Sequence, residues 1–330
     1  MSGLAVVATR PSPDDPLAAL DVVDAPEVKP LDGDTVVPVR AAALNHHDLW
    51  ALRGVGAALE SFPCVLGNDG AGDGYVLYPV IGCGETDACY GCRVGDQSLC
   101  RRLTVIGEGR PGTMAPEVAL PAGNVVPSPV TLTTAESACL PAAYMTAYNM
   151  LFRASQPEPG DTVMVTGATG GLGVAALQLG SAAGFRMVAQ VRRPEVAPEL
   201  EALGAEAVIT TEDNPKRMIG REVDVVIESV GEATWGTSLR SLRSGGTIVV
   251  AGATSGANPP ADLQRVFWRQ IRIAGASLGS LHDFESLVKF VDDKGVKPHI
   301  AGMYHVTEAR AAFEHLYRGG PIGKVVLEFD

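Results

Sequence analysis

The chain has 330 residues, a length that favours two domains over a single hydrophobic core. Hydrophobic residues make up 46% of the sequence, so its 38 glycines and 23 prolines indicate many turns in a folded protein rather than disorder. The formal net charge of −12 argues against binding to nucleic acid or to an acidic membrane surface. The N-terminus lacks a signal-peptide pattern and no apolar run approaches the length of a membrane span, so we expect a cytoplasmic protein with small-molecule partners.

Residues 1–127 combine short alternating strands, such as Thr35–Arg40, with frequent proline and glycine and little helix. This pattern predicts a small β-barrel. Polar residues gather in the stretch from Asn45 to Trp50, which directly follows a strand. If His46 and His47 continue that strand, they point to opposite faces and at most one faces a cleft. Asp48 is an alternative acceptor for backbone N–H groups in its own turn.

Four of the six cysteines, Cys83, Cys89, Cys92 and Cys100, form a C-x5-C-x2-C-x7-C cluster within a glycine-containing loop. Disulfides are unfavourable in a cytosolic protein, so the cluster predicts tetrahedral thiolate coordination of one zinc ion, with reduced free thiols as the alternative. Cys64 and Cys139 have apolar neighbours and are interpreted as core thiols.

The stretch from Val163 to Val174 predicts a buried strand that runs into a glycine turn and then into a helix. Gly170 and Gly173 keep the spacing of the last two glycines of the dinucleotide-binding fingerprint, and Ala168 stands at the first position. The helix N-terminus would offer N–H groups to a pyrophosphate. A tight turn without a ligand is the alternative.

Strand and helix periods alternate after this turn. The expected strands after Val163 are Arg186–Val191, Ala207–Thr210, Val223–Ile227, Thr247–Val250 and Ile271–Ala274. Such alternation predicts a doubly wound parallel sheet of six strands, with its ligand at the carboxyl ends of the strands.

Cofactor choice depends on the end of the second of these strands, where an NAD-specific protein carries a carboxylate. Here the sequence is Gln190-Val-Arg-Arg193, without a carboxylate. Arg192 and Arg193 can pair with a 2′-phosphate, which predicts NADPH, although two arginines on a solvated loop are the alternative.

Five motifs occur in a shared order: Arg40–Trp50, Gly67–Gly72, Leu140–Tyr148, the glycine turn, and Gly323–Leu327. With these motifs the chain resembles the medium-chain dehydrogenase/reductase superfamily, in particular its quinone-oxidoreductase-like and zinc-type alcohol-dehydrogenase-like branch. The resemblance covers nearly the whole chain.

The resemblance implies an α/β protein with a GroES-like β-barrel catalytic domain, residues 1–127 and 271–330, and a Rossmann NADP-binding domain, residues 128–270. One departure concerns the barrel: Asp73–Pro79 follows Gly72 almost at once, where the family has a longer segment before the cysteine loop. We therefore expect part of the barrel to be missing or rebuilt. The family's structural zinc pattern matches the last three cysteines of the cluster. Cys83 is separated from them by a longer stretch than the family's first cysteine, so it must reach across this longer gap to complete the site.

The resemblance also implies that the usual ligands of a catalytic zinc are absent. Asn45 stands at the position of the usual cysteine, Asn68 at that of the histidine, and Asp69 at that of a glutamate. Neutral amides are poor zinc ligands. The candidate catalytic donors are Asn45, His46, His47, Asn68, Tyr144 and Tyr148. The expected cofactor-binding residues are Thr146, Gly167, Ala168, Gly170, Gly171, Leu172, Gly173, Arg192, Arg193, Ser229, Val230, Ala253, Thr254 and Lys324.

These observations predict an NADPH-dependent reductase that delivers hydride, without catalytic zinc, to the activated C=C bond of an enone, a quinone or a conjugated biosynthetic intermediate. Reductive ring closure is a variant of the same chemistry. The alternatives are a zinc-dependent alcohol dehydrogenase or carbonyl reductase and a non-catalytic NADPH-binding sensor. The apolar edge of strand Ile271–Gly275 further predicts a homodimer.

Overall fold

The computed structural model describes residues 3–55, 62–319 and 322–330. It divides the chain into two compact units, unit 1 with Met1–Met145 and Leu278–Asp330, and unit 2 with Thr146–Ser277. The sequence-based boundaries were at 127/128 and 270/271. The differences have two sources: the helical segment Leu140–Tyr144 packs on unit 1 elements, and the strand after residue 271 pairs within the sheet of unit 2.

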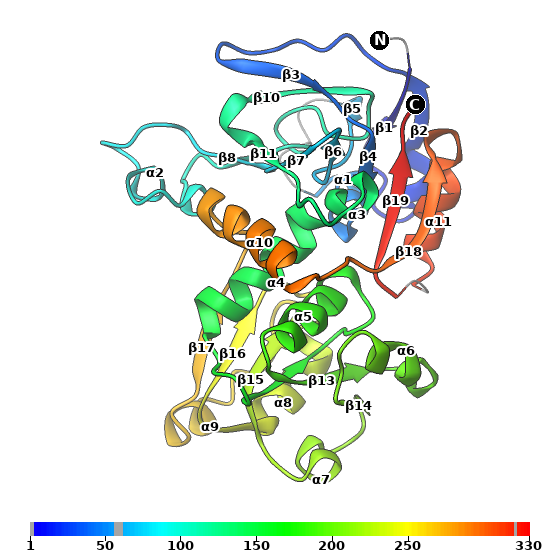
Figure 1. Ribbon diagram of the computed structural model, residues 1–330. Helices are drawn as coiled ribbons and strands as arrows, with labels where there is room; N and C mark the ends of the chain where they lie inside the picture. Colours follow the sequence, from blue (N-terminus) through cyan, green and yellow to red (C-terminus); the bar gives the residue numbers. More distant parts are fainter. Residues whose placement is uncertain (1–2, 56–61, 320–321) are drawn as a thin grey trace. The chain divides into compact units, whose positions relative to one another are not determined.

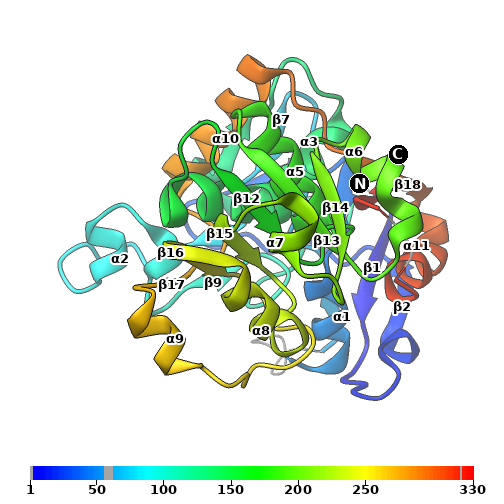
Figure 2. The same ribbon diagram turned by 90° about the horizontal axis from the view of Figure 1, so that it is seen from below.

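Unit 2 is built on one six-stranded sheet in which every pair of neighbouring strands is parallel (Figures 1 and 2). Its strands, in spatial order, are β14 (Ala207–Thr210), β13 (Arg186–Val191), β12 (Thr162–Val165), β15 (Val223–Glu228), β16 (Leu242–Val250) and β17 (Arg272–Gly275). All four residues of β12 are buried, as expected for a central strand covered on both faces. The predicted six-stranded doubly wound sheet is confirmed.

The helices of unit 2 connect successive strands. They are α5 (Gly171–Ala182), α6 (Ala197–Ala202), α7 (Pro215–Ile219), α8 (Glu232–Ser241) and α9 (Leu263–Trp268), and the unit opens on the helical run α4 (Met145–Tyr148) and Asn149–Ser155. The chain moves from β12 to β13 through α5 and from β15 to β16 through α8, in opposite directions across the sheet. Because such crossovers are right-handed, α5 and α8 cover opposite faces. The strand order reverses between β12 and β15, and a ligand is expected there.

Unit 1 contains the barrel. Its largest sheet has the order β11 (Val125–Pro127), β7 (Tyr75–Leu77), β6 (Ala71–Gly72), β4 (Ala41–Ala43), β19 (Lys324–Glu328) and β18 (Ile300–His305). Smaller sheets join β2 (Leu20–Asp24), β1 (Leu4–Ala8) and β5 (Cys64–Val65); β10 (Glu117–Pro121) and β3 (Asp34–Pro38); and β8 (Val80–Ile81) and β9 (Thr104–Val105). One buried cluster of apolar side chains fills this barrel. The GroES-like and Rossmann-like fold class is thereby confirmed.

The unusually short segment after Gly72 forms a tight hairpin between β6 and β7. Gly74 occupies the left-handed region of the turn, with a φ of 83°, where a side chain would be strained. Strand β11 pairs with the other side of β7, so the abbreviated hairpin leaves no unpaired edge on β7. Strand pairing is therefore continuous from β6 through β7 to β11 across this short segment.

The helices of unit 1 are α1 (His46–Arg53), α2 (Tyr90–Arg93), α3 (Thr134–Ala138), the segment Leu140–Tyr144, α10 (Leu281–Lys294) and α11 (Ala309–Tyr317). The expectation that His46 and His47 continue a strand is wrong, because they are the first two residues of α1. Asp48 accepts a hydrogen bond from the backbone N–H of Asn45, 2.7 Å away, and so caps this helix. None of the described helices is long and apolar enough to cross a membrane.

Candidate active site

A buried lysine organises the polar cluster of unit 1. The Lys324 ammonium donates to three oxygens: the backbone oxygen of Leu44 at 2.8 Å, Asn45 Oδ1 at 2.6 Å and Asp69 Oδ2 at 2.9 Å. Strand pairing of β19 with β4 brings this lysine beside the chain segment that follows β4. All three ammonium protons are thereby engaged. A direct contact of Lys324 with the cofactor would replace one of these bonds, and its place near the cofactor stays a prediction.

Asp69 balances the charge of Lys324, and both side chains are buried. The second oxygen of Asp69, Oδ1, accepts from the backbone N–H of Ala142 at 2.8 Å. Burial raises the pKa of Asp69, while the Lys324 ammonium opposes that rise. Removal of either partner would leave an unpaired buried charge in the barrel, which would destabilise the folded state around the site.

The two asparagines that replace zinc ligands are bonded to each other. Asn45 Nδ2 donates to Asn68 Oδ1 at 2.8 Å. Since an ammonium group can only donate, Asn45 must turn its oxygen to Lys324 and its nitrogen to Asn68. No described residue accepts from Asn68 Nδ2. The structure therefore brings Asn45 and Asn68 together, as two of the candidate donors, and gives each amide a defined orientation.

The two adjacent histidines have opposite electrostatic environments. Burial lowers the pKa of His46, and the positive charges of Lys324 and Arg53 lower it further. Burial also acts to lower the pKa of His47, but the hydrogen bond between His47 Nε2 and Glu108 Oε1 and the negative charges of Asp48, Glu108 and Asp69 together outweigh it, so this pKa is raised. His47 is therefore the histidine that holds a proton more firmly. Glu108, which the sequence reasoning missed, lies in a loop distant in sequence and carries no motif.

The remaining candidate donors are the two tyrosines. Tyr144 is fully buried, and its hydroxyl accepts from the backbone N–H of His299 at 3.3 Å. Its burial raises the pKa well above the usual value. Tyr148 belongs to α4 in unit 2, and its ring packs against that of Phe152 at a tilt of 42°, with centroids 4.6 Å apart. A role for either hydroxyl in the reaction stays a prediction.

The glycine turn of unit 2 has the strand–turn–helix form that was predicted. Gly170 precedes α5, and a Cβ at this position would approach only the oxygen of Gly167, at 3.5 Å. A Cβ on Gly173 would lie 2.5 Å from that same oxygen and 2.6 Å from the Cα of Ala168. The two glycines thus have different roles: Gly173 permits the close packing of turn and helix, whereas Gly170 leaves space beside the backbone.

A buried glutamate at the end of β15 joins two loops near this turn, and the sequence reasoning missed it. Glu228 Oε1 accepts from the Thr166 hydroxyl, from the backbone N–H groups of Val230 and Gly231 and from the Thr234 hydroxyl, at 2.8 to 3.0 Å. Its other oxygen accepts from Ser238. The Val230 N–H, expected near the cofactor, is engaged in this network. A carboxylate directly after an apolar strand was the available signal.

Most of the other expected cofactor residues directly follow strands of the sheet, at their carboxyl ends. Ser229 follows β15 and bonds Thr166 through both its N–H and its hydroxyl. Ala253 and Thr254 follow β16 and are exposed, and Thr146 lies in α4. Arg192 and Arg193 follow β13 directly, are exposed and form no ion pair with any described residue. Both guanidinium groups are therefore available to an external anion.

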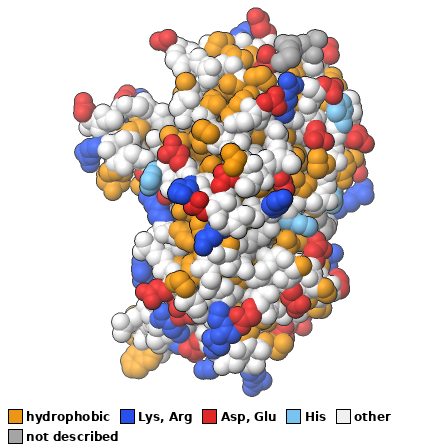
Figure 3. Space-filling view, viewed as in Figure 1, with side chains coloured by type: hydrophobic (Ala, Val, Ile, Leu, Met, Phe, Trp, Pro, Cys, Tyr) orange, Lys and Arg blue, Asp and Glu red, His pale blue; other side chains and the backbone are white. Residues whose placement is uncertain are grey.

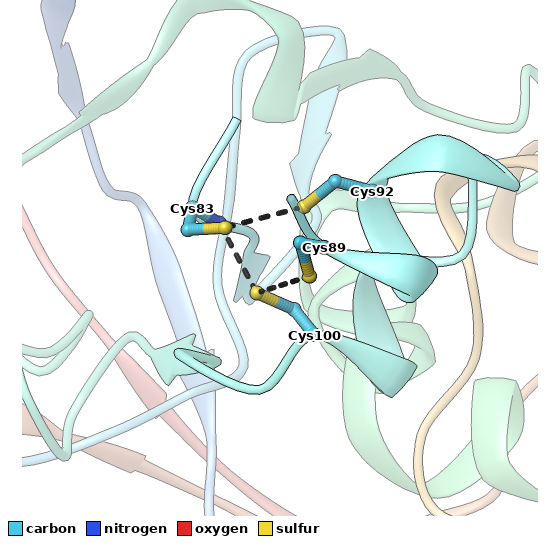
Figure 4. Close-up of side chains that lie close together, drawn as sticks. All are labelled: Cys83, Cys89, Cys92 and Cys100. Atoms are coloured by element: carbon cyan, nitrogen blue, oxygen red, sulfur yellow. Dashed lines mark hydrogen bonds between the residues drawn. The ribbon is translucent and has the colours of Figure 1, made fainter. Parts of the chain in front are cut away.

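The four clustered cysteines come together in unit 1 (Figure 4). The Sγ atoms of Cys83 and Cys92, and those of Cys89 and Cys100, are 3.7 Å apart. Four thiolates on one zinc ion, with Zn–S bonds of about 2.3 Å, would lie about 3.8 Å from one another. Cys83 thus reaches the cluster despite its longer spacing. The N–H groups of Cys83 and Arg102 donate to Cys100 Sγ at 3.2 and 3.4 Å. The residues present fit a tetrahedral zinc site.

The other two cysteines have a different environment. Cys139 is fully buried, and Cys64 packs against the barrel core. Burial raises the pKa of Cys139 to about 12, so its thiol stays protonated at neutral pH. Both positions agree with their interpretation as core thiols.

A GroES-like barrel unit combined with a doubly wound sheet and its glycine turn defines a pyridine-nucleotide dehydrogenase or reductase. Two family models match, the alcohol dehydrogenase GroES-like domain over residues 31–130 and the zinc-binding dehydrogenase over residues 171–293. An acryloyl-coenzyme A reductase of Metallosphaera sedula is 29% identical, covering 93% of this chain and 96% of its own length. A zinc-type alcohol dehydrogenase-like protein of Schizosaccharomyces pombe is 30% identical, covering 90% of this chain and 91% of its own length.

Among solved structures, an NAD-dependent alcohol dehydrogenase matches over the whole of both chains, with a TM-score of 0.91 and 31% identity. The chain therefore belongs to the medium-chain dehydrogenase/reductase superfamily and is an oxidoreductase. This confirms the resemblance drawn from its motifs.

Proposed function

We propose that the protein is an NADPH-dependent reductase that transfers hydride to a C=C bond conjugated to a carbonyl group, as in an enone, a quinone or an α,β-unsaturated thioester, without a catalytic metal. The observation that carries this proposal is the Lys324–Asn45–Asn68 cluster, in which neutral amide donors stand where metal ligands would be required. The acryloyl-coenzyme A reductase similarity supports the same reaction class.

The chemistry follows from the charge that develops during the reaction. Bound NADPH supplies the hydride. Addition of hydride to a conjugated acceptor moves negative charge onto the carbonyl oxygen, and a positioned N–H donor stabilises that charge. Asn68 Nδ2, with no acceptor among the described residues, is the donor that we assign to this oxygen. His47, whose pKa is raised, is the group that we assign to proton delivery.

The preference for NADPH rests on unit 2. Arg192 and Arg193 would hold the 2′-phosphate through charge-assisted hydrogen bonds, and the N-terminus of α5 would receive the pyrophosphate. Gly170 leaves space for that approach. The absence of a carboxylate at the end of β13 removes the usual partner of an unmodified ribose.

Alcohol oxidation with a catalytic zinc is the main alternative, and the donor chemistry opposes it. A zinc ion at Asn45 and Asn68 would have amide ligands and would compete with the Lys324 ammonium for Asn45 Oδ1 and Asp69. We propose instead one zinc ion with a structural role, held by the four clustered cysteines.

The decisive experiment measures NADPH oxidation by the purified full chain with enones, quinones and unsaturated thioesters, and alcohol oxidation with NADP⁺. We expect turnover with at least one conjugated acceptor and negligible oxidation of simple alcohols. Chelator-sensitive alcohol oxidation would contradict the proposal and favour the zinc enzyme. NADPH binding without turnover on any acceptor would favour the sensor.

We also propose a homodimer formed through the outer edge of the sheet in unit 2. Strand β17 is the last in the sheet, and Ile273 is 47% exposed. Helix α9, which precedes β17 in the chain, exposes Leu263, Phe267 and Trp268. Apolar side chains are visible on the surface of unit 2 in Figure 3. Light scattering of the wild type and of Ile273→Lys tests this. A wild-type monomer at micromolar concentration would refute the dimer.

A further inference from the structure

Lys324, Asn45 and Asn68 form a directional chain of hydrogen bonds in unit 1. Lys324 Nζ donates to Asn45 Oδ1 at 2.6 Å, and Asn45 Nδ2 donates to Asn68 Oδ1 at 2.8 Å. Each step has one permitted direction, because the ammonium has no acceptor and each amide has one oxygen and one nitrogen. The direction set by the lysine therefore reaches Asn68, which it does not contact.

We propose that Lys324 and Asn45 are positioning residues that orient the Asn68 amide, so that its Nδ2 group, and not its oxygen, faces the substrate. This inference rests on the proposed function, since it concerns the same oxyanion donor. An unanchored asparagine could present either atom, and its oxygen would repel the developing negative charge. The lysine thus determines the sign of the electrostatic effect at the reacting carbonyl.

Three features of the cluster favour this role. The Lys324 ammonium is immobilised by two further acceptors, Leu44 O and Asp69 Oδ2, so it cannot swing away from Asn45. Asp69 is itself anchored by the Ala142 N–H, which fixes the pair to the backbone. Hydrogen bonds in such a chain also polarise one another, so the ammonium strengthens the donor at its far end.

Asn45→Asp tests the orientation directly. Aspartate has nearly the same shape and still accepts from Lys324, but its second oxygen cannot donate to Asn68. It must instead accept, which turns Asn68 so that Nδ2 points to residue 45 and Oδ1 points outward. Asn45→Ala removes the anchor and leaves Asn68 free to adopt either orientation. We therefore expect activity in the order wild type, Asn45→Ala, Asn45→Asp.

This order distinguishes an orienting role of Asn45 from a packing role. If Asn45 acted only through packing, the isosteric Asn45→Asp would be a milder change than Asn45→Ala. Asn68→Ala should lower kcat by about 10²-fold, with the NADPH dissociation constant unchanged. We expect Asn45→Asp to fall to that level or below it, because an outward Asn68 Oδ1 both lacks the donor and repels the developing charge. In the Asn68→Ala background, Asn45→Asp should have no further effect. An additional loss in that double variant would show that the new charge acts through space, and would overturn the proposal.

A second readout does not depend on turnover. Hydrogen exchange of the side-chain amides, followed by NMR, should show a protected Asn45 Nδ2 and a solvent-exchanging Asn68 Nδ2 in the wild type. In Asn45→Asp the Asn68 Nδ2 should become protected. If the Asn68 amide exchanges at the same rate in both proteins, the orienting role is refuted. If the orientation changes but no acceptor is reduced, the proposed function fails and the orienting role stands.

Discussion

The carboxylate of Glu228 accepts a hydrogen bond of 2.9 Å from the hydroxyl of Thr166, which joins the end of β15 to the turn after β12. The same oxygen holds the backbone N–H groups of Val230 and Gly231. One buried side chain therefore connects the two loops that meet where the strand order of the sheet reverses. Ligands bind at that place in doubly wound sheets.

Replacement of Glu228 should reveal how much this connection contributes. In Glu228→Gln, the one remaining side-chain oxygen can still accept from the four donors that bond Oε1 in the wild type. We therefore expect this variant to lower the unfolding free energy by about 1–2 kcal/mol. Glu228→Ala removes the acceptor of five donors, of which only the Thr166 and Thr234 hydroxyls have a second acceptor, and should cost more than about 3 kcal/mol. Chemical denaturation measures both, with the exposed Glu201→Gln as control. Equal stability of the glutamine and alanine variants would contradict this account.

The two glycines of the fingerprint should respond differently to alanine. Gly173→Ala places a Cβ within 2.6 Å of backbone atoms on two residues, so we expect a loss of roughly 1–3 kcal/mol of stability. Gly170→Ala meets no close atom and should cost at most about 1 kcal/mol, as a less favourable helix cap. Its main effect should be weaker NADPH binding. Thermal unfolding and fluorescence titration separate the two effects, and similar behaviour of both variants would be evidence against the assignment.

Cofactor selectivity should depend on the two exposed arginines. Arg192→Glu with Arg193→Glu removes charge-assisted contacts, and we expect NADPH affinity to fall by about 1.5–3 kcal/mol. NADH binding should change little, since it lacks the phosphate. Fluorescence titration with both cofactors measures the ratio, with Arg10→Glu as an exposed charge control. A ratio unaltered by the double change would show that the arginines do not contact the phosphate.

Metal content should follow the cysteine cluster. We expect one zinc ion per chain in protein purified without added metal, and loss of that zinc with lower stability in Cys83→Ser. Cys64→Ser, outside the cluster, should retain it. Elemental analysis with thermal unfolding decides the outcome. Zinc-free wild-type protein that is folded and reduced would exclude the structural site, and a second stoichiometric zinc would support the alcohol dehydrogenase alternative.

The His47–Glu108 pair should give a pH-dependent contribution to stability. The pKa of His47 is raised from 6.5, so its contribution is complete below 6.5 and is lost as pH rises through the higher folded value. The pKa of Glu108 is lowered from 4.5 by His47, so its contribution is complete above 4.5 and is lost as pH falls through the lower folded value. The pair is therefore most stabilising between pH 4.5 and 6.5.

The Tm difference between wild type and His47→Gln should consequently be largest in that interval. Both side chains are about a quarter exposed, so we expect no more than about 1 kcal/mol. Glu108→Gln should show the same pH dependence. A difference that stays constant from acid to alkaline pH would mean that the pair makes no ionic contribution.

Local patterns in the sequence were sufficient for the sheet of unit 2 and for the turn that opens α5. Buried parallel strands are continuous apolar runs, and the strand–turn–helix form depends on glycines whose spacing is visible in the chain. The cysteine spacing likewise predicted a cluster, because ligands of one metal lie close together in sequence in such loops. These features depend on neighbours within a few dozen residues.

Tertiary structure decided the contacts between distant segments. Lys324 meets Asn45 only because β19 pairs with β4, and His47 meets Glu108, which lies 61 positions further along the chain. Glu228 gathers donors from two turns and a helix; its place at the end of an apolar strand signals a role but does not specify these partners. The helical start of α1 at His46 is by contrast a local feature, since Asn45 and Asp48 form a capping box within three residues. Composition and periodicity determine which elements form, whereas the direction of each side-chain hydrogen bond depends on which charged group the fold places beside it.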